Sequence, residues 1–451
     1  MNVIIVGCGK IGTTLLQSMV AEGHNVLGVD TDPQVIAQIT DQYDAMGVCG
    51  NGADCDTLTE ASAQTADLLV AVTESDELNM LSCFLARRMG ARHTVARIRN
   101  PEYNDKSLTV LRQELMLSLS INPELLTAQE IYNLLRLPSA AKIEMFSQHR
   151  FEMVELRLRE ESPLCGMSLT ELRKSYRADF LVGAVQRGDT AIIPDGSFVL
   201  QKGDKVGFLA AHNQIQKLLR LIGLVQKRAR NIMILGGGKT SYYLAKMLLS
   251  GGNSVKIIEQ DAKRCQEIAE ALPEAVVIHG DGAQQELLLE EGIRTTDAFV
   301  ALTGMDEENI LISIFAASQK VPKTVTKINR PELSSMAEKL GADSIVSPKN
   351  VTANMIVWYA RALQNSQGGV ETVYRLMDNK VEAVEFTVGS DFPAIGVPLR
   401  ELRRKPNVLI GGILRGRRAV IPTGDDQLLA GDQVVVMATG QRLTELKDIL
   451  G

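Results

Sequence analysis

The chain has 451 residues, of which 45% are apolar and 23% charged, and its 48 Lys and Arg against 54 Asp and Glu give a formal net charge of −6 at pH 7. This length predicts two to four domains that each bury a core, and the composition excludes collagen-like, mucin-like and intrinsically disordered proteins. The negative charge argues against binding nucleic acid through a strongly basic surface.

The first 100 residues alternate predicted strands and helices. Short apolar runs predict four strands, at residues 3–6, 26–29, 66–72 and 94–98. Helical patterns lie between them, with one apolar face over Ile11–Met19 and an Ala-, Leu- and Met-rich segment at Leu78–Met89. Strands separated by helices of this length imply right-handed crossovers and a parallel, doubly wound sheet.

A glycine-rich loop follows the first predicted strand. Gly7, Gly9 and Gly12 form the pattern G-x-G-x-x-G, and Asp30 ends the next strand. Gly7 permits a tight turn, Gly9 lets a pyrophosphate approach the backbone, and Gly12 lets the helix pack close to the sheet. The helix N-terminus and Lys10 then attract phosphate, while Asp30 accepts hydrogen bonds from ribose and disfavours a 2′-phosphate. We expect NAD(H) or an adenine mononucleotide here; a glycine turn without a ligand is the alternative.

Two further candidate residues lie at the carboxyl ends of the third and fourth predicted strands, where open sheets of this kind bind ligands. Thr73 is placed to bind the distal half of a dinucleotide, and Arg97 is placed to pair with phosphate or with an acidic group of a partner subunit. The alternatives are a helix N-cap for Thr73, and likewise for Thr303 in the second half, and a surface ion pair for Arg97.

The second half of the chain repeats the first. Residues 1–10 recur at 230–239, Asp30 finds Glu259, and Lys202-Gly-Asp204 finds Ala430-Gly-Asp432, at offsets of 228–230. The unit is larger than a solenoid repeat, so the chain is interpreted as two copies of a two-domain cassette. Each cassette has a Rossmann-like domain and then a small, strand-rich α+β domain with Gly-Asp turns. The predicted domains are 1–137, 138–222, 230–364 and 370–451.

The second glycine loop is altered. It comprises Gly236, Gly237, Gly238, Lys239, Thr240 and Ser241. Ser241 replaces the third glycine but is small enough to keep the helix close, and Glu259 retains the ribose-binding charge. We expect binding with altered affinity; the alternative is a degenerate loop kept for structure.

No catalytic centre, metal site or membrane span is predicted. Tyr242-x-x-x-Lys246 has the spacing of short-chain dehydrogenases, but it lies on the helix just after the second loop, where it does not face a nicotinamide. The six cysteines form no C-x-x-C pair or Cys/His cluster, which favours reduced thiols in a cytosolic protein. No run of about 18 uncharged apolar residues and no basic leader is present. Basic clusters at 403–405 and 415–418 are either solvated turns or partner contacts.

These motifs together resemble the TrkA family, the cytosolic regulatory subunits of Trk-type potassium uptake systems, which are built from tandem RCK domains. The resemblance rests on the VGCGKIG and LGGGKTS loops, the acids Asp30 and Glu259, the Thr-x-x-Asp-Glu-x-Asn segments and the duplicated C-terminal cassettes. It implies a non-catalytic protein that forms a homotetrameric ring beneath a dimeric potassium-conducting membrane subunit, at the inner face of the membrane. NAD, NADH, ATP or ADP would set the conformation of that ring.

The resemblance also implies the ligand-binding residues. In the first copy these are Gly7, Cys8, Gly9, Lys10, Ile11, Asp30, Thr73, Glu74 and Arg97, and in the second Gly236, Gly237, Gly238, Lys239, Thr240, Glu259, Thr303 and Lys327. The second copy departs from the pattern at Ser241, at Gly304 in place of Glu74, and at Lys327 in place of Arg97. Two other functions stay open: an NAD-dependent oxidoreductase, and a cytosolic regulator of another cation or amino-acid transporter.

Overall fold

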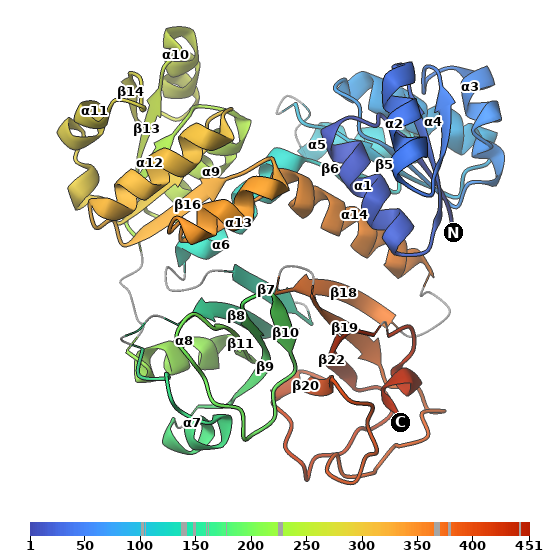
Figure 1. Ribbon diagram of the computed structural model, residues 1–451. Helices are drawn as coiled ribbons and strands as arrows, with labels where there is room; N and C mark the ends of the chain where they lie inside the picture. Colours follow the sequence, from blue (N-terminus) through green and yellow to red (C-terminus); the bar gives the residue numbers. More distant parts are fainter. Residues whose placement is uncertain are drawn as a thin grey trace.

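The computed structural model contains two six-stranded parallel sheets and two five-stranded antiparallel sheets (Figure 1). It describes the whole chain except residues 101–102, 104, 137–141, 148–149, 159, 161, 177, 224–228, 365–369, 378–379 and 442. The predicted domain boundary at 137–138 and most of the boundary segments before 230 and 370 lie outside the described residues. Among the described helices, none is long and apolar enough to cross a bilayer.

The first parallel sheet has the order β3-β2-β1-β4-β5-β6, so the chain reverses direction across the sheet between β1 and β4. Its strands are β1 (Asn2–Val6), β2 (Asn25–Asp30), β3 (Met46–Cys49), β4 (Leu68–Ala71), β5 (His93–Arg97) and β6 (Leu119–Ile121). The helices are α1 (Lys10–Ala21), α2 (Pro33–Gln42), α3 (Cys55–Glu60), α4 (Asp76–Met89), α5 (Asp105–Glu114) and α6 (Pro123–Arg136). The predicted doubly wound fold is confirmed, and the switch between β1 and β4 opens the crevice where such folds bind ligands.

The second parallel sheet repeats this order as β14-β13-β12-β15-β16-β17. Its strands are β12 (Asn231–Leu235), β13 (Ser254–Glu259), β14 (Val276–His279), β15 (Ala298–Ala301), β16 (Lys323–Lys327) and β17 (Ser344–Val346). The helices are α9 (Lys239–Ser250), α10 (Ala262–Ala271), α11 (Gln285–Glu290), α12 (Asp306–Ser318), α13 (Pro331–Lys339) and α14 (Pro348–Gln364). The duplication seen in the sequence is therefore a duplication of topology.

The two small domains pack their sheets face to face. The first contains β7 (Lys142–Phe146), β8 (Phe151–Arg157), α7 (Leu169–Ser175), β9 (Phe180–Arg187), β10 (Thr190–Ile192), β11 (Lys205–Ala211) and α8 (His212–Leu221). The second contains β18 (Val370–Leu376), β19 (Val381–Thr387), β20 (Val408–Arg415), β21 (Arg418–Val420) and β22 (Gln433–Thr439). One core joins them, including Phe151 and Met153 from the first sheet and Val435 and Met437 from the second.

The Gly-Asp turns that recur in the sequence stabilise both small domains in the same way. Asp204 accepts hydrogen bonds from the guanidinium of Arg187 at 2.8 Å and from a backbone N–H in its own turn. Asp432 does the same with Arg415. Both acids are buried. Because a buried carboxylate is costly unless it is paired and hydrogen-bonded, the arginine and the turn are retained together.

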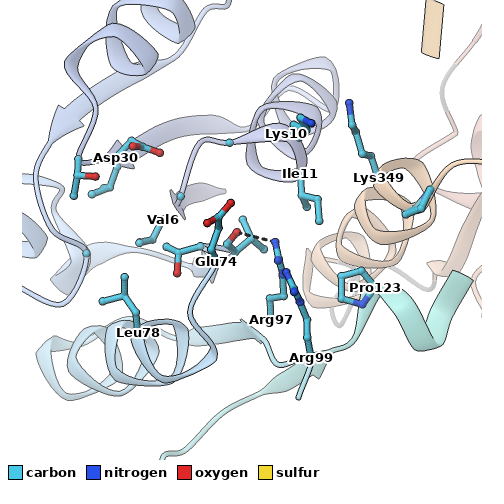
Figure 2. A pocket seen from close by; sticks show the side chains of 18 of the residues that line it. Val6, Lys10, Ile11, Asp30, Glu74, Leu78, Arg97, Arg99, Pro123 and Lys349 are labelled. Carbon is cyan, nitrogen blue, oxygen red and sulfur yellow. Dashed lines mark hydrogen bonds between the residues drawn. The ribbon is translucent and has the colours of Figure 1, made fainter. Parts of the chain in front are cut away.

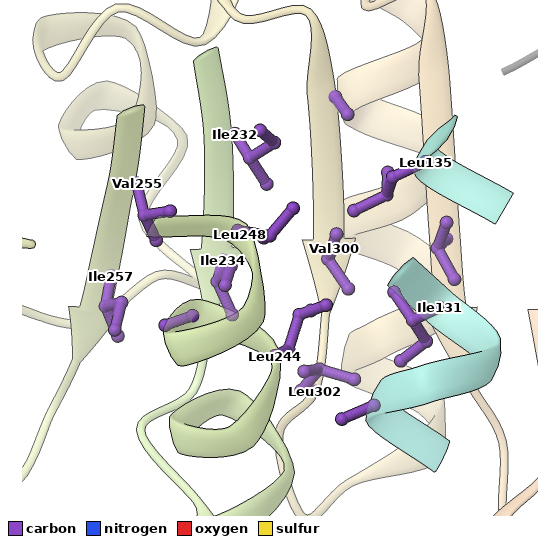
Figure 3. Close-up of a cluster of buried hydrophobic side chains, with 14 of the residues drawn as sticks. Ile131, Leu135, Ile232, Ile234, Leu244, Leu248, Val255, Ile257, Val300 and Leu302 are labelled. Carbon is purple, nitrogen blue, oxygen red and sulfur yellow. The ribbon is translucent and has the colours of Figure 1, made fainter. Parts of the chain in front are cut away.

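The last helix of each nucleotide-type domain packs on the opposite copy. Ile131 and Leu135 of α6 lie among the buried side chains of the second sheet and α9, as Figure 3 shows. Reciprocally, Ile356 and Ala360 of α14 join the core of the first sheet and α1. Each helix thus fills a hydrophobic gap that the other copy leaves. The periodicity of the sequence shows that these helices are amphipathic but not which sheet they cover.

A buried ion pair accompanies this exchange. Glu22, which ends α1, accepts two hydrogen bonds from the guanidinium of Arg361 on α14, one of them 2.6 Å long at Nε. The same guanidinium donates to Glu382 on β19 at 3.2 Å. Both Glu22 and Arg361 are almost fully buried. The first nucleotide-type domain, α14 and the second small domain therefore meet at one charge cluster.

We predict that Glu22→Gln destabilises the protein by about 3 kcal/mol, because the buried Arg361 loses its more buried charged partner and keeps only Glu382. The control is Glu160→Gln, which removes the exposed ion pair to Lys202 and is expected to cost about 1 kcal/mol or less. Urea unfolding of the full chain measures both. Equal midpoints for the two variants would contradict a structural role for the pair between α1 and α14.

Candidate functional site

The first glycine loop is tightly packed on one side and open on the other. Gly7 has a φ of +89°, and a Cβ on it would lie 2.8 Å from the backbone nitrogen of Thr73. A Cβ on Gly12 would lie 1.9 Å from the carbonyl oxygen of Gly7. A Cβ on Gly9 would meet nothing within 4 Å. Gly7 and Gly12 are thus required by the chain itself, whereas the space beside Gly9 is open.

The carboxylate of Asp30 supports this loop from the neighbouring strand. It accepts hydrogen bonds from the backbone N–H of Cys8 at 2.7 Å and of Asp32 at 3.0 Å. The side chain of Cys8 lies in the core, where burial and the charge of Asp30 raise the pKa of its thiol to about 12. Cys8 therefore offers a ligand only its backbone, while Asp30 lines the crevice beside the loop.

Thr73 is held by a side chain that the sequence analysis did not single out as a site residue. Asn79 of α4 accepts hydrogen bonds from the backbone N–H and the hydroxyl of Thr73, at 2.8 and 2.7 Å, and its amide donates to the carbonyl of Arg97. The N-cap of α4 is Ser75, so the alternative of an N-cap at Thr73 is wrong. Thr303 is not a side-chain cap either, because the N-cap of α12 is Met305.

Arg97 is buried at the carboxyl end of β5, which contradicts the alternative of a surface ion pair. One terminal nitrogen donates to the carbonyl of Val72 at 3.3 Å, and Nε has no hydrogen-bond partner among the described residues. Figure 2 shows the side chain at the edge of the crevice, close to Glu74. Burial, with the nearby charge of Arg99, lowers the pKa of Arg97. Such a group gains stability when an anion binds beside it.

A cavity of about 710 Å³ joins these groups and receives residues from both copies. From the first copy it contains Gly7, Gly9, Lys10, Ile11, Asp30, Thr73, Glu74 and Arg97, and from the second Thr240 and Lys327. The remaining predicted residues do not line it: Cys8, Gly12, Gly236, Gly237, Gly238, Lys239, Glu259 and Thr303. The two halves therefore contribute to one crevice, and they do so unequally.

Several lining residues were not predicted. They include Arg99, Glu124, Asn329, Pro348 and Lys349. Pro348 and Lys349 begin α14, and Figure 2 shows Lys349 close to Lys10 at the start of α1. Their presence follows from the exchange of α6 and α14, which no local motif reveals. The signal available in the sequence was the duplication, because Arg99 and Asn329 occupy equivalent positions of the two copies, at an offset of 230.

Positive charge dominates the cavity. Five cationic side chains line it, Lys10, Arg97, Arg99, Lys327 and Lys349, against the carboxylates of Asp30, Glu74 and Glu124. Burial lowers the pKa of Lys327, and burial together with the charge of Lys10 lowers that of Lys349. Arg99 is paired with Glu124 at 3.3 Å. The arrangement is suited to an anionic ligand, whose charge would relieve the repulsion among the cations.

The second glycine loop is held by the protein's own side chains. Glu259 accepts hydrogen bonds from the backbone N–H of Gly237 at 2.5 Å and of Asp261 at 2.9 Å, as Asp30 does in the first copy. In addition, Nε of Arg264 donates to the carbonyl of Gly237 at 2.7 Å. Ser241 is fully buried, and its hydroxyl has no hydrogen-bond partner within the described part of the chain. This loop differs from the first in both packing and charge.

The structure also places the other motifs noted in the sequence. Tyr242 packs on the core beneath α9, and Lys246 is exposed on the same helix. No group of three or more His, Cys, Asp or Glu is placed to hold a metal ion among the residues that the structure describes. Of the two basic clusters, Arg404 donates to the carbonyl of Val408 and Arg415 pairs with Asp432.

Comparison with known proteins agrees with this architecture. The TrkA-N domain family matches residues 3–114 and 232–348, and the TrkA-C domain family matches residues 153–223 and 383–451. The Trk system potassium uptake protein TrkA of Vibrio alginolyticus is 32% identical, over 97% of this chain and 95% of its own. TrkA homolog 1 of Methanosarcina mazei is 31% identical over 99% of both chains.

Solved structures show the same fold. The RCK domain of GsuK superposes with a TM-score of 0.63 at 17% identity, covering 97% of this chain and 92% of that one. The GsuK channel bound to NAD gives a TM-score of 0.62 at 18% identity and covers 97% of this chain and 77% of that one.

The geometry of the first loop predicts that alanine substitutions at two of its glycines differ in their effect on stability. Gly12→Ala places a methyl group against the carbonyl of Gly7 and is expected to destabilise the protein by about 1–3 kcal/mol, although alanine is the better helix former. Gly9→Ala enters open space and is expected to change stability by about 0.5 kcal/mol or less. Urea unfolding compares them. A Gly12→Ala variant as stable as the wild type would show that the loop is not constrained at this contact.

Proposed function

The chain belongs to the TrkA family, and from this premise we propose that it is a non-catalytic subunit that senses nucleotides and regulates a Trk-type potassium uptake membrane protein. The observation that carries the proposal is the cation-lined cavity, in which an open glycine loop, Asp30 and the buried Arg97 face residues of the second copy. The glycine loop and Arg97 favour an anionic ligand, and Asp30 favours a ribose.

We assign the ligand as NAD or NADH, with ATP or ADP as further ligands of the same crevice. The diphosphate is proposed to lie beside Gly9, at the N-terminus of α1, where free backbone N–H groups and Lys10 favour negative charge. Asp30 is proposed to accept hydrogen bonds from the adenosine ribose and to disfavour the 2′-phosphate of NADP. Thr73, Glu74 and Arg97 then face the distal half of the ligand. Solved structures of GsuK bound to NAD and to ADP give the ligand classes a precedent.

The proposed mechanism is a shift between conformations that differ in the angle between the two nucleotide-type domains. Because the cavity is lined by both copies, a ligand that contacts Arg97 and Lys327 or Lys349 at once has an affinity that depends on that angle. A nearly complete switch requires about 5.5 kcal/mol of differential affinity. In a homotetrameric ring, several sites contributing about 1–2 kcal/mol each meet this requirement. The ring is proposed to dock on the cytoplasmic face of the membrane subunit.

An NAD-dependent oxidoreductase is less well supported. Proton transfer beside a nicotinamide most often uses His, Tyr, Cys or an acid of suitable pKa. Among the described residues that line the cavity, none is His, Tyr or Cys, and two of its three acids are engaged, Asp30 with the glycine loop and Glu124 with Arg99. Regulation of a different cation or amino-acid transporter would use the same cavity and differs only in the membrane partner, which co-purification of that partner identifies.

Calorimetric titration of NADH, NAD, ATP and ADP tests the site. Asp30→Ala is expected to weaken NADH binding at least 10-fold, because the ribose and the loop both lose an acceptor, while Glu259→Ala has a smaller effect. Asp32→Ala is the matched control: it removes the same charge two residues away and a helix cap, but not a residue lining the cavity. Equal binding by wild type, Asp30→Ala and Asp32→Ala would remove the assignment.

A second measurement tests the absence of catalysis. The purified chain with NADH and a panel of small carbonyl compounds is expected to show no loss of absorbance at the reduced-nicotinamide band beyond that of buffer. Gly9→Ala, which keeps the fold but obstructs the diphosphate, distinguishes any contaminating activity from activity of this site. Sustained consumption of NADH that Gly9→Ala abolishes would favour the oxidoreductase.

A further inference from the structure

The internal duplication allows each cluster of side chains to be compared with its equivalent in the other copy. One cluster, described above, lies where α14 meets α1 and β19: Arg361 binds Glu22 and Glu382. At its outer edge, on the turn before β19, Lys380 faces Asp189 of the first small domain at 3.8 Å. Arg361 is therefore neutralised by two carboxylates of the protein, and the exposed Asp189 faces Lys380 at the rim of the cluster.

The equivalent position in the first copy is a cavity of about 660 Å³. It lies where the C-terminal end of α6 meets β7, β8 and the turn between β20 and β21, and it is lined by Arg136, Met145, Arg150, Glu152, Ala211, Asn213, Arg417 and Ala419. In Figure 1, α6 and α14 both run between the nucleotide-type domains and the small domains. The nucleotide crevice is at the other end of α6, about 20 Å away, so the two cavities are separate.

We call the cluster of Arg361, Lys380 and their acids the closed cluster. Both of its cations have a cationic equivalent in the sequence of the first copy. Arg136 occupies the position of Arg361, since both lie 13 residues after the proline that begins their helix, and Arg150 occupies that of Lys380. The difference between the two places therefore lies in the acids.

Two of the three acids are missing around the cavity. The position of Glu22 is Gly251 in the second copy, and the position of Asp189 is Arg417. Glu152, the equivalent of Glu382, is retained and buried. The described lining thus has three guanidinium groups and one carboxylate. The protein thus supplies carboxylates around the cations of the closed cluster, but at the equivalent place in the first copy it leaves a cavity and positive charge.

A helix N-terminus adds to this positive potential. Ala211 and Asn213, which line the cavity, are the N-cap and the second residue of α8, and this N-cap makes no side-chain hydrogen bond. The free backbone N–H groups of the first turn of α8 are therefore available to an anion. Guanidinium groups bind phosphate and carboxylate oxygens through paired hydrogen bonds.

We propose that this cavity binds a small phosphate-bearing anion, which takes the place that Glu22 and Asp189 occupy in the other copy. A diphosphate matches the charge better than a single carboxylate, because three arginines face one retained acid. The bound anion would join α6, the first small domain and the β20–β21 turn of the second, just as Glu22 joins α1, α14 and β19. The proposal is independent of the nucleotide crevice.

Inorganic pyrophosphate is the probe, titrated by calorimetry into the full chain in a buffer without phosphate or sulfate, with and without saturating NADH. Arg417→Asp restores the residue of the closed cluster and is expected to weaken pyrophosphate binding at least 10-fold. Arg418→Asp, the neighbouring exposed residue outside the cavity, makes the same charge change and is expected to alter binding less than 3-fold. Arg136→Gln is a second variant, expected to weaken binding in the same direction as Arg417→Asp.

Three results would overturn the proposal: no binding of pyrophosphate by the wild type, equal binding by Arg417→Asp and Arg418→Asp, or binding that NADH displaces completely. The comparison of the two arginine variants does not require any nucleotide, so failure of the nucleotide assignment leaves this test intact. Unfolding midpoints of the variants, both at exposed positions of one hairpin turn, verify that each is folded.

Discussion

The mutual burial of α6 and α14 is the constraint on which the rest of the molecule depends. Each helix follows the sheet of its own copy in the chain but completes the core of the other. Separating the halves would expose both apolar faces to water, at about 25 cal/mol per Å². Both helices begin with a proline at the nucleotide crevice. Their burial therefore also determines which residues of each copy face the first glycine loop.

This shared crevice gives a ligand a physical means to influence the relation between the halves. A ligand confined to one rigid domain would bind equally at every angle between the domains, and it would shift nothing however tightly it bound. In the proposed function, contacts from the buried Arg97 on one side and from Lys327 and Lys349 on the other make the affinity depend on that angle. The cluster of Glu22, Arg361 and Glu382 extends the connection from the end of α1 to the second small domain.

Features of the fold and the site that depend on residues close together in the chain could be predicted from the sequence. The strands, the glycine loop and the position of Asp30 follow from patterns within 30 residues, and the duplication follows from direct comparison of the halves. It did not predict that Lys349 lines the first crevice, because that depends on which sheet α14 covers. It also left Thr73 with a helix cap as an alternative, since the competing hydrogen bond from its hydroxyl to the side-chain oxygen of Asn79 requires the folded turn. Burial of Arg97 was equally invisible in the sequence.

The two copies differ at both ends of the molecule, at the nucleotide crevice and beside the small domains. At the nucleotide end both loops are open beside their middle glycine, Gly9 or Gly238, and an acid holds each of them. The loops differ because Arg264 binds the carbonyl of Gly237 and because only the first loop contributes glycines to the cavity. At the small-domain end the second copy is closed by Glu22 and the first copy is open. A duplicated chain can fill one copy of a site with its own side chains and keep stability there, while the other copy retains the charge and the space for a ligand. We infer that this division accounts for the asymmetry at both ends.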